Sequence, residues 1–231
     1  MINELITQLV EAGVHYGHQS KKWHPKMKPY LMEKRGGIHI INVEETVKCL
    51  DKAAEFLGEL ASKNKKILFV GCKRQAQESV REAADACGQF YVNHRWLGGM
   101  LTNYETIKRS IKRLNELENI EKSPDFKSMS KKELAALGRE RDKLTRNLEG
   151  IRNMGGLPDA VVVVDSARET IAVAEAIRLK IPVVAIVDSN ADPGKITYPI
   201  PGNDDAIRSI RVLLQNLADQ IIANTKEKAS A

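Results

Sequence analysis

Short continuous apolar runs alternate with amphipathic segments over much of the chain. The runs are KILFVGC (66–72), QFYV (89–92), AVVVVD (160–165) and PVVAIVD (182–188). Their β-branched content and lack of polar alternation are typical of strands buried on both faces of a parallel sheet. The segments that join the first two runs and the last two have helical periodicity, so each pair forms a β-α-β unit. The pattern therefore predicts an α/β domain.

Helical patterns extend this domain on both sides. Residues 41–103 and 152–225 accordingly form the sheet domain, which starts with an amphipathic helix capped by Asn42 and ends with a second one. Residues 1–40 are expected to pack on this core as a basic and aromatic segment. Residues 226–231 should form a frayed tail.

Residues 104–151 interrupt the pattern, because nearly half of them are charged and no run resembles a strand. Two capping-box patterns, Thr102 with Glu105 and Ser130 with Glu133, mark helix starts, and Pro124 favours a turn between the helices. Charged outer faces cannot be core, so we predict an inserted antiparallel coiled-coil helical hairpin. Its apolar seams would contain Tyr104, Ile107, Ile111, Leu114 and Leu117 on one helix and Leu134, Leu137, Leu144, Leu148 and Ile151 on the other.

The net charge of the chain indicates more about its partners than the rest of its composition does. Lys and Arg exceed Asp and Glu by 36 to 30, a net charge of +6, which favours a polyanionic partner. The opening residues do not resemble a targeting segment and no apolar run reaches membrane-spanning length, so we expect a cytoplasmic protein with no membrane partner. Three isolated cysteines, Cys49, Cys72 and Cys87, are typical of free thiols in a reducing compartment.

Cations and aromatic rings are interleaved near the N-terminus. Pro25 and Pro29 favour an extended chain there, the cations can neutralise phosphates, and Trp23 can stack on an unpaired base. A solvated loop anchored by its aromatic rings is the alternative, but it gives no reason for so many positive charges. The cations of this basic segment are Lys21, Lys22, Lys26, Lys28, Lys34 and Arg35.

The first strand-to-helix turn, FVGCKRQAQ, lies where an α/β protein can hold a phosphate. It lacks both glycine-rich phosphate-binding motifs, so Lys73 and Arg74 can be surface charges as readily as phosphate contacts.

Aspartates follow the later strands. Asp188, Asp204 and Asp205 can bind a divalent cation if they meet at one sheet edge, and His18 is an additional candidate ligand. The alternative, which we favour, is that they cap turns and helix N-termini. No cofactor is therefore required, and a structural cation stays a secondary hypothesis.

The first hairpin helix has a cationic ridge, and the chain has no recognisable catalytic motif. A solvated helix face would explain the ridge as well as RNA contact does. A cytosolic doubly wound enzyme that uses the strand-end aspartates with a metal or a phosphorylated substrate is the rival hypothesis. The ridge consists of Lys108, Arg109, Lys112 and Arg113.

The stretch NHRWLGGMLTN (93–103) connects the sheet domain to the hairpin. Gly98 and Gly99 can turn the chain out of the sheet, Thr102 can cap the projecting helix, and Trp96 can pin its base to the core. These four residues form the predicted hairpin junction, where Arg95 can additionally touch RNA.

Ordered motifs over essentially the whole chain resemble the S-two family of bacterial ribosomal proteins, the second protein of the small subunit. They are LVEAGVHYGHQSKKWHPKMKPYL, RGGIHIINVEET, FVGCKRQAQ, NHRWLGGMLTN, GLPDAVVVVD and PVVAIVDSNADP. The resemblance implies a flavodoxin-like parallel sheet flanked by helices, with the hairpin inserted after the second strand.

The resemblance also implies a function without catalysis. Family members are structural constituents of the ribosome that bind small-subunit (16S) ribosomal RNA where head and body meet, as monomers among neighbouring ribosomal proteins. They help to anchor S-one, the largest small-subunit protein, which captures messenger RNA. By charge, the positions expected to face RNA are the basic segment with Trp23, Lys73, Arg74, Arg95 and the hairpin ridge.

Overall fold

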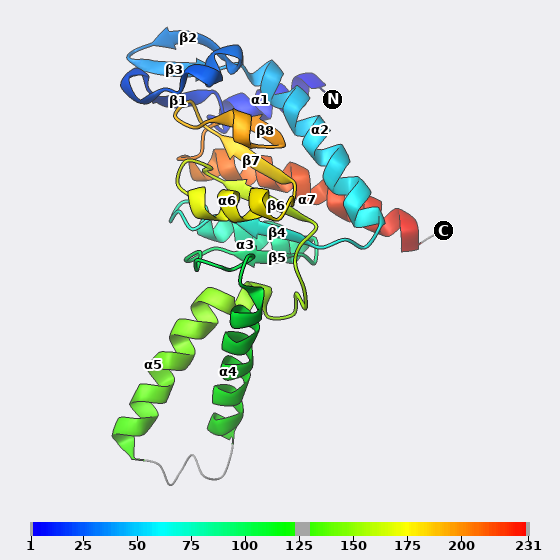
Figure 1. Ribbon diagram of the computed structural model, residues 1–231. Coiled ribbons are helices and arrows are strands. Elements are labelled where there is room, and N and C mark those ends of the chain that lie inside the picture. The colour runs from blue at the N-terminus through cyan, green and yellow to red at the C-terminus, as the bar shows by residue number, and fades with distance from the viewer. Residues whose placement is uncertain (1, 123–129, 230–231) are drawn as a thin grey trace.

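Five parallel strands form the central sheet of the protein (Figure 1). The computed structural model describes residues 2–122 and 130–229. The spatial order β5-β4-β6-β7-β8 places the second strand of the sheet outside the first and then proceeds in sequence, which is the flavodoxin-like order. The predicted fold class is therefore confirmed. The strands are β4 (Ile67–Val70), β5 (Phe90–Val92), β6 (Ala160–Val164), β7 (Val183–Val187) and β8 (Tyr198–Pro201).

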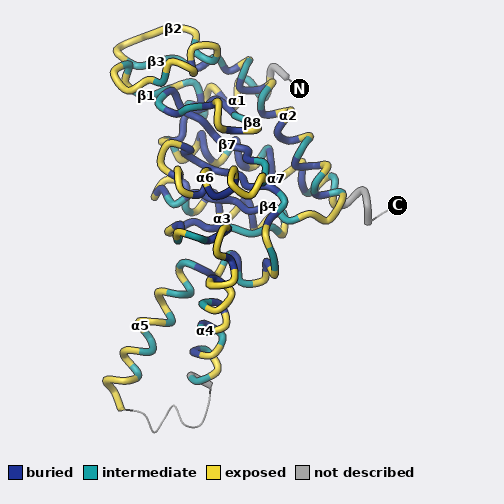
Figure 2. Tube along the Cα trace, viewed as in Figure 1, coloured by how far each residue is buried: buried dark blue, intermediate teal, exposed yellow. Residues whose placement is uncertain are grey.

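The sheet separates two hydrophobic cores. On β4, Ile67 and Phe69 point into one core while Leu68 and Val70 point into the other, as the two-residue period of a strand requires. Both faces are covered, so the middle strands are buried throughout (Figure 2). This double burial explains why the strands are continuous apolar runs.

Helices on the first face are α1 (Ile2–Glu11), α2 (Val43–Ser62), α3 (Gln77–Ala86) and α7 (Ile207–Ala229). On the second face, α6 (Thr170–Arg178) packs beside residues from the hairpin and its junction. Helix α7 continues to Ala229, so it includes most of the segment predicted to fray. Among the described residues, no helix has the length and apolar character needed to cross a membrane.

The N-terminal segment forms a small sheet that the sequence pattern did not predict. Its strands β1 (Tyr16–Gln19), β2 (Leu31–Arg35) and β3 (Ile38–Ile41) are antiparallel in the order β1-β3-β2. Two short 3-10 turns, Ser20–Lys22 and Pro25–Tyr30, replace the expected extended chain between β1 and β2. Met27, fully buried in the second core, fixes this segment to the sheet domain.

The predicted hairpin consists of α4 (Tyr104–Lys122) and α5 (Lys131–Leu148), which contact each other and project away from the sheet (Figure 1). Ile107, Ile111 and Leu114 are buried on α4. The capping box of Ser130 and Glu133 starts α5 as expected. Pro124 lies outside the described residues, and coiled-coil supercoiling of the pair stays a prediction.

Candidate functional surfaces and the strand-end cluster

The hairpin junction is organised by Glu175, which lies on α6 and is 8% exposed. One carboxylate oxygen accepts hydrogen bonds from the Trp96 indole N–H (3.1 Å) and the Gly99 amide (2.8 Å). The other oxygen accepts from the Leu101 amide and from both the amide and the hydroxyl of Thr102, each at 3.0 Å. Although burial alone would raise the pKa of Glu175, these donors lower it below the ordinary glutamate value. The carboxylate therefore stays ionised and fixes the loop.

Two details of the junction differ from the sequence-based prediction. Gly99 has a φ of +85°, whereas Gly98 has no positive φ and open space where a Cβ would lie, so only Gly99 requires glycine. Thr102 does not form a capping box with Glu105, because its hydroxyl donates to Glu175 and Glu105 pairs with Lys108 instead. Glu175 itself was missed, although a single acidic residue between Val173 and Ala176 on a buried helix face was a visible anomaly.

A buried ion cluster occupies the carboxyl-terminal edge of the sheet, where this fold can bind a phosphate. Lys73 is 7% exposed, and its ammonium lies 3.1 Å from Asp165, 2.7 Å from Asp204 and 2.6 Å from Asp205. Burial alone would lower the pKa of Lys73, but the contacts with Asp204 and Asp205 outweigh it and raise this pKa. Lys73 is therefore an internal counterion, whereas the sequence-based prediction placed it among the RNA-facing residues.

Three of the four predicted metal ligands meet in the same cluster. Ligand atoms of His18, Asp188 and Asp204 all lie within 4.8 Å of one another. His18 Nδ1 lies 2.9 Å from Asp188, and its Nε2 lies 3.3 Å from Asp205, which is half exposed. Burial, together with the charges of Asp165 and Asp188, raises the pKa of Asp204 to about 7. The sequence thus predicted residues that do lie in one cluster, and the aspartates of this cluster act both as caps and as ion-pair partners.

The remaining candidate cations fall into two groups. Three have carboxylate partners: Lys26 with Asp192 (2.9 Å), Lys108 with Glu105 (2.9 Å) and Arg113 with Glu140 (3.0 Å). The others are exposed and, among the described residues, have no carboxylate within ion-pair distance. These unpaired cations are Lys21, Lys22, Lys28, Lys34, Arg35, Arg74, Arg95, Arg109 and Lys112.

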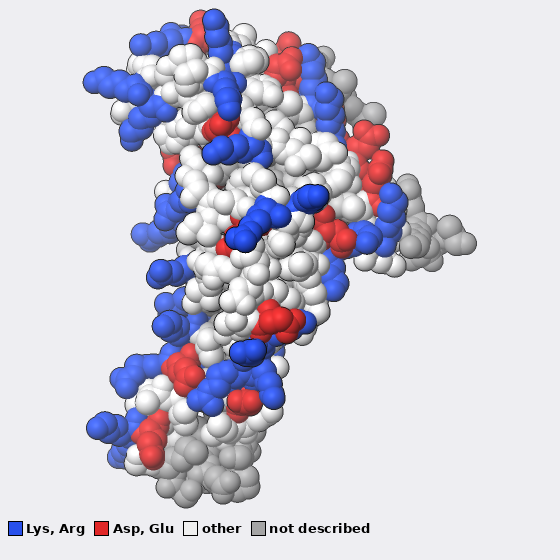
Figure 3. Space-filling model, viewed as in Figure 1, with Lys and Arg blue, Asp and Glu red and all other residues white. Residues whose placement is uncertain are grey.

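Lys and Arg side chains gather over the N-terminal sheet and continue along the left edge of the molecule to the hairpin, with few acidic groups between them (Figure 3). We call this surface, which runs from the N-terminal sheet (β1–β3) to the hairpin (α4 and α5), the basic edge. Such a distribution concentrates positive potential on one side of the protein and favours an extended polyanion.

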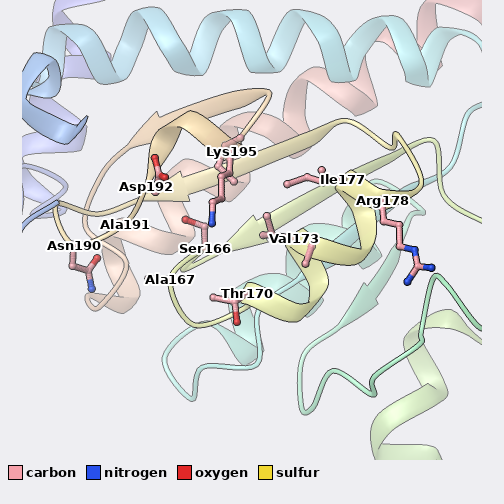
Figure 4. Close-up of a pocket in the computed structure, with 12 residues that line it drawn as sticks. Ser166, Ala167, Thr170, Val173, Ile177, Arg178, Asn190, Ala191, Asp192 and Lys195 are labelled. Atoms are coloured by element: carbon pink, nitrogen blue, oxygen red, sulfur yellow. The ribbon is translucent and has the colours of Figure 1, made fainter. Parts of the chain in front are cut away.

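An apolar hollow of about 610 Å³ lies beside α6 (Figure 4). Val173 and Ile177 line it on the helix side, and Asp192 and Lys195 lie on the opposite wall. Asp192 is already paired with Lys26, and the hollow contains no constellation of a nucleophile, a base and an oxyanion donor among the described residues.

The fold and these surfaces define a class: a flavodoxin-like α/β protein with a projecting charged hairpin and a basic edge, in which the usual ligand edge of the sheet is filled by internal ion pairs. The family model described as Ribosomal protein S2 matches residues 9–224. The chain belongs to the ribosomal protein S2 family and is a structural protein of the small ribosomal subunit.

Family membership also decides between the two hypotheses raised by the sequence. The ribosomal protein S2 family is a family of structural ribosomal proteins, so the prediction of a protein without enzymatic activity is confirmed. The rival hypothesis of a doubly wound enzyme is wrong, and the strand-end aspartates need another role.

Proposed function

We propose that the protein binds small-subunit (16S) ribosomal RNA at the junction of head and body, as a cytoplasmic monomer within the ribosome. In this position it contacts neighbouring ribosomal proteins and helps to anchor the mRNA-binding protein S-one. The observation that carries the RNA-binding proposal is the basic edge, because most of the candidate cations have no carboxylate within ion-pair distance in the described part of the chain. Cations without partners are free to replace the counterions of RNA phosphates.

The N-terminal sheet supplies the densest part of this surface. Lys21 and Lys22 are exposed in the first 3-10 turn, directly before Trp23. The Trp23 ring is 36% exposed and lies 5.3 Å from the His39 ring, centroid to centroid. A partly exposed indole held beside a second ring and two ammonium groups suits an unpaired base and its phosphates.

Binding of the full-length protein to 16S ribosomal RNA over a range of salt concentrations tests this proposal. Replacing Lys21 and Lys22 with alanine should weaken binding and make the slope of log K against log salt about 2 less steep. The control removes Lys52, on α2, and Lys63, directly after this helix, which lies on the other side of the molecule. Salt-independent binding of the unmodified protein, or equal slopes for both double variants, would overturn the electrostatic account.

The anchoring of S-one needs a separate test, since RNA binding does not require it. Small subunits reconstituted without this protein should retain less S-one after sedimentation than complete subunits do. Adding the purified protein back should restore S-one, and equal retention in both particles would contradict the anchoring proposal.

We also propose that the strand-end cluster can bind a structural divalent cation. Asp165, Asp188, Asp204 and Asp205 carry more negative charge than Lys73 and His18 can neutralise. The Asp204 Oδ2 atom is buried and has no hydrogen-bond partner, which leaves one lone pair available. An imidazole with carboxylate oxygens suits zinc or manganese better than magnesium.

Thermal unfolding with and without added Zn²⁺ or Mn²⁺ tests the cation. The metal should raise the midpoint of the unmodified protein and of an Asp219→Asn control, which alters an exposed residue on α7. It should not raise the midpoint of Asp188→Asn. Equal shifts in all three proteins would place any bound metal elsewhere.

A further inference from the structure

A hollow of about 640 Å³ lies where the hairpin joins the sheet domain, and its lining is basic. Its walls come from the junction loop and from the last turns of α5, which are far apart in the sequence. We call it the basic recess, and the described residues that line it include no carboxylate. They are His94, Arg95, Trp96, Leu97 and Gly98 on the loop, and Lys143, Arg146 and Asn147 on the helix.

The positive charge of the recess is available to a ligand. Arg95, Lys143 and Arg146 are exposed, and among the described residues none has a carboxylate within ion-pair distance. Two other arginines have carboxylate partners. Arg113, on α4, forms a bidentate ion pair with Glu140 (3.0 and 3.1 Å), and Arg152, after α5, forms one with Glu118 (2.9 and 2.6 Å). Arg113 and Arg152 are thus neutralised within the protein, whereas the three cations around the recess are available to a ligand.

Both walls of the recess are held in place. Trp96, at the back, is buried and donates its indole N–H to Glu175. On the helix side, Leu148, directly after Asn147, and Ile151, in the turn that follows α5, are fully buried and fix the end of α5 against the second core. A site whose walls are already ordered loses little conformational entropy when a ligand binds.

We propose that the basic recess binds the sugar–phosphate backbone of a ribosomal RNA strand, with Arg95 on one side and Lys143 and Arg146 on the other. This inference rests on the proposed function and adds two residues of α5 that no sequence motif indicated. Cations on two separate walls suit a strand that passes between them, because successive phosphates can each meet one wall. Arg95 and Arg146 can each hold a phosphate through two parallel N–H donors.

An acidic protein segment could satisfy the same cations, but the surroundings favour RNA. The basic edge continues to the hairpin (Figure 3), and the recess lies where the hairpin joins the sheet domain, so a strand that follows this edge can extend to the recess. Half-buried Asn147 offers an amide that can hydrogen-bond to a phosphate or a ribose hydroxyl.

Salt-dependent binding of the full-length protein to 16S ribosomal RNA tests the inference with two double variants. Lys143→Ala with Arg146→Ala removes two cations from the recess. Lys131→Ala with Lys132→Ala removes two exposed cations from the opposite end of the same helix. The recess variant should reduce the steepness of log K against log salt by about 2, and the control should leave it unchanged. Circular dichroism melts establish that both variants fold.

The outcomes separate the recess from the wider proposal. If the unmodified protein fails to bind the RNA, the proposed function fails. If it binds with a steep salt dependence and both variants behave alike, RNA binding stands and the recess proposal is overturned. If the recess variant keeps full RNA affinity but loses affinity for a polyglutamate peptide, the partner is an acidic protein and the RNA assignment is wrong.

Discussion

Replacing Glu175 with glutamine should destabilise the protein almost as much as replacing it with alanine. All five groups that contact this carboxylate are donors. A glutamine side chain of the same shape turns an NH₂ group toward two or three of them, so donors face donors. A substitution that is conservative in volume is therefore not conservative in hydrogen bonding.

The magnitude follows from which donors lose their acceptor. The Trp96 indole and the Leu101 amide belong to buried residues and donate to opposite carboxylate oxygens, so glutamine leaves one of them without an acceptor, and a buried unsatisfied donor costs about 1–3 kcal/mol. Water can reach the partly exposed groups of Gly99 and Thr102, which limits their contribution. The remaining hydrogen bonds also lose a charged acceptor, so we expect Glu175→Gln to lower the free energy of unfolding by about 2–4 kcal/mol.

Urea unfolding followed by tryptophan fluorescence measures this loss, with Glu55→Gln, on the exposed face of α2, as the control. The pH dependence gives a second readout. The pKa of Glu175 is lowered in the folded protein, so its contribution is complete above the unfolded-state pKa, near 4.5, and is lost as the pH falls through the folded value. Glu175→Gln should thus have a shallower loss of stability in acid. A glutamine variant within about 0.5 kcal/mol of the control would refute the reasoning.

Further substitutions test other features of the fold by the same unfolding assay. Gly99→Val, at a positive φ, should cost about 1–3 kcal/mol, while Gly98→Val should change stability by less than about 0.5 kcal/mol; equal effects would contradict the assignment. Gly150→Ala places a methyl against the backbone of β5 and should cost about 1–3 kcal/mol, whereas Gly138→Ala, in open space within α5, should stabilise by up to about 1 kcal/mol. Lys73→Met leaves buried carboxylates unpaired and should cost about 3–5 kcal/mol, and a loss below about 1 kcal/mol would contradict the role of Lys73 as their counterion.

The parts of the fold that could be predicted are those in which one pattern extends over many residues. Four strands of the central sheet are continuous apolar runs, and the hairpin is a long charged segment with apolar seams. Each was located from the sequence. Strand β8 was missed because Pro199 and Pro201 argue against a strand. It lies at the edge of the sheet, paired only with β7, so prolines can be accommodated there.

The functional surfaces depend on distances that the sequence does not contain. Lys73 and Arg74 are neighbours in one turn, yet one is buried among carboxylates and the other is exposed. Arg95 precedes the hairpin in the sequence, while Lys143 and Arg146 lie near the end of the hairpin. No local motif could therefore indicate the recess that these residues line. The excess of Lys and Arg predicted a polyanionic partner, whereas tertiary contacts decide which of these cations are left without a carboxylate partner.

Helix α7 follows the other elements of the first core in the sequence, and this order has a consequence for synthesis. This helix packs on α2 and α3 and completes the first core, to which Leu213, Leu214 and Leu217 contribute fully buried side chains. Until those residues leave the exit tunnel, one face of the sheet lacks part of its cover, while the second face already has α6 in place. The nascent chain therefore exposes an apolar surface until α7 emerges and should depend on chaperones until this helix docks.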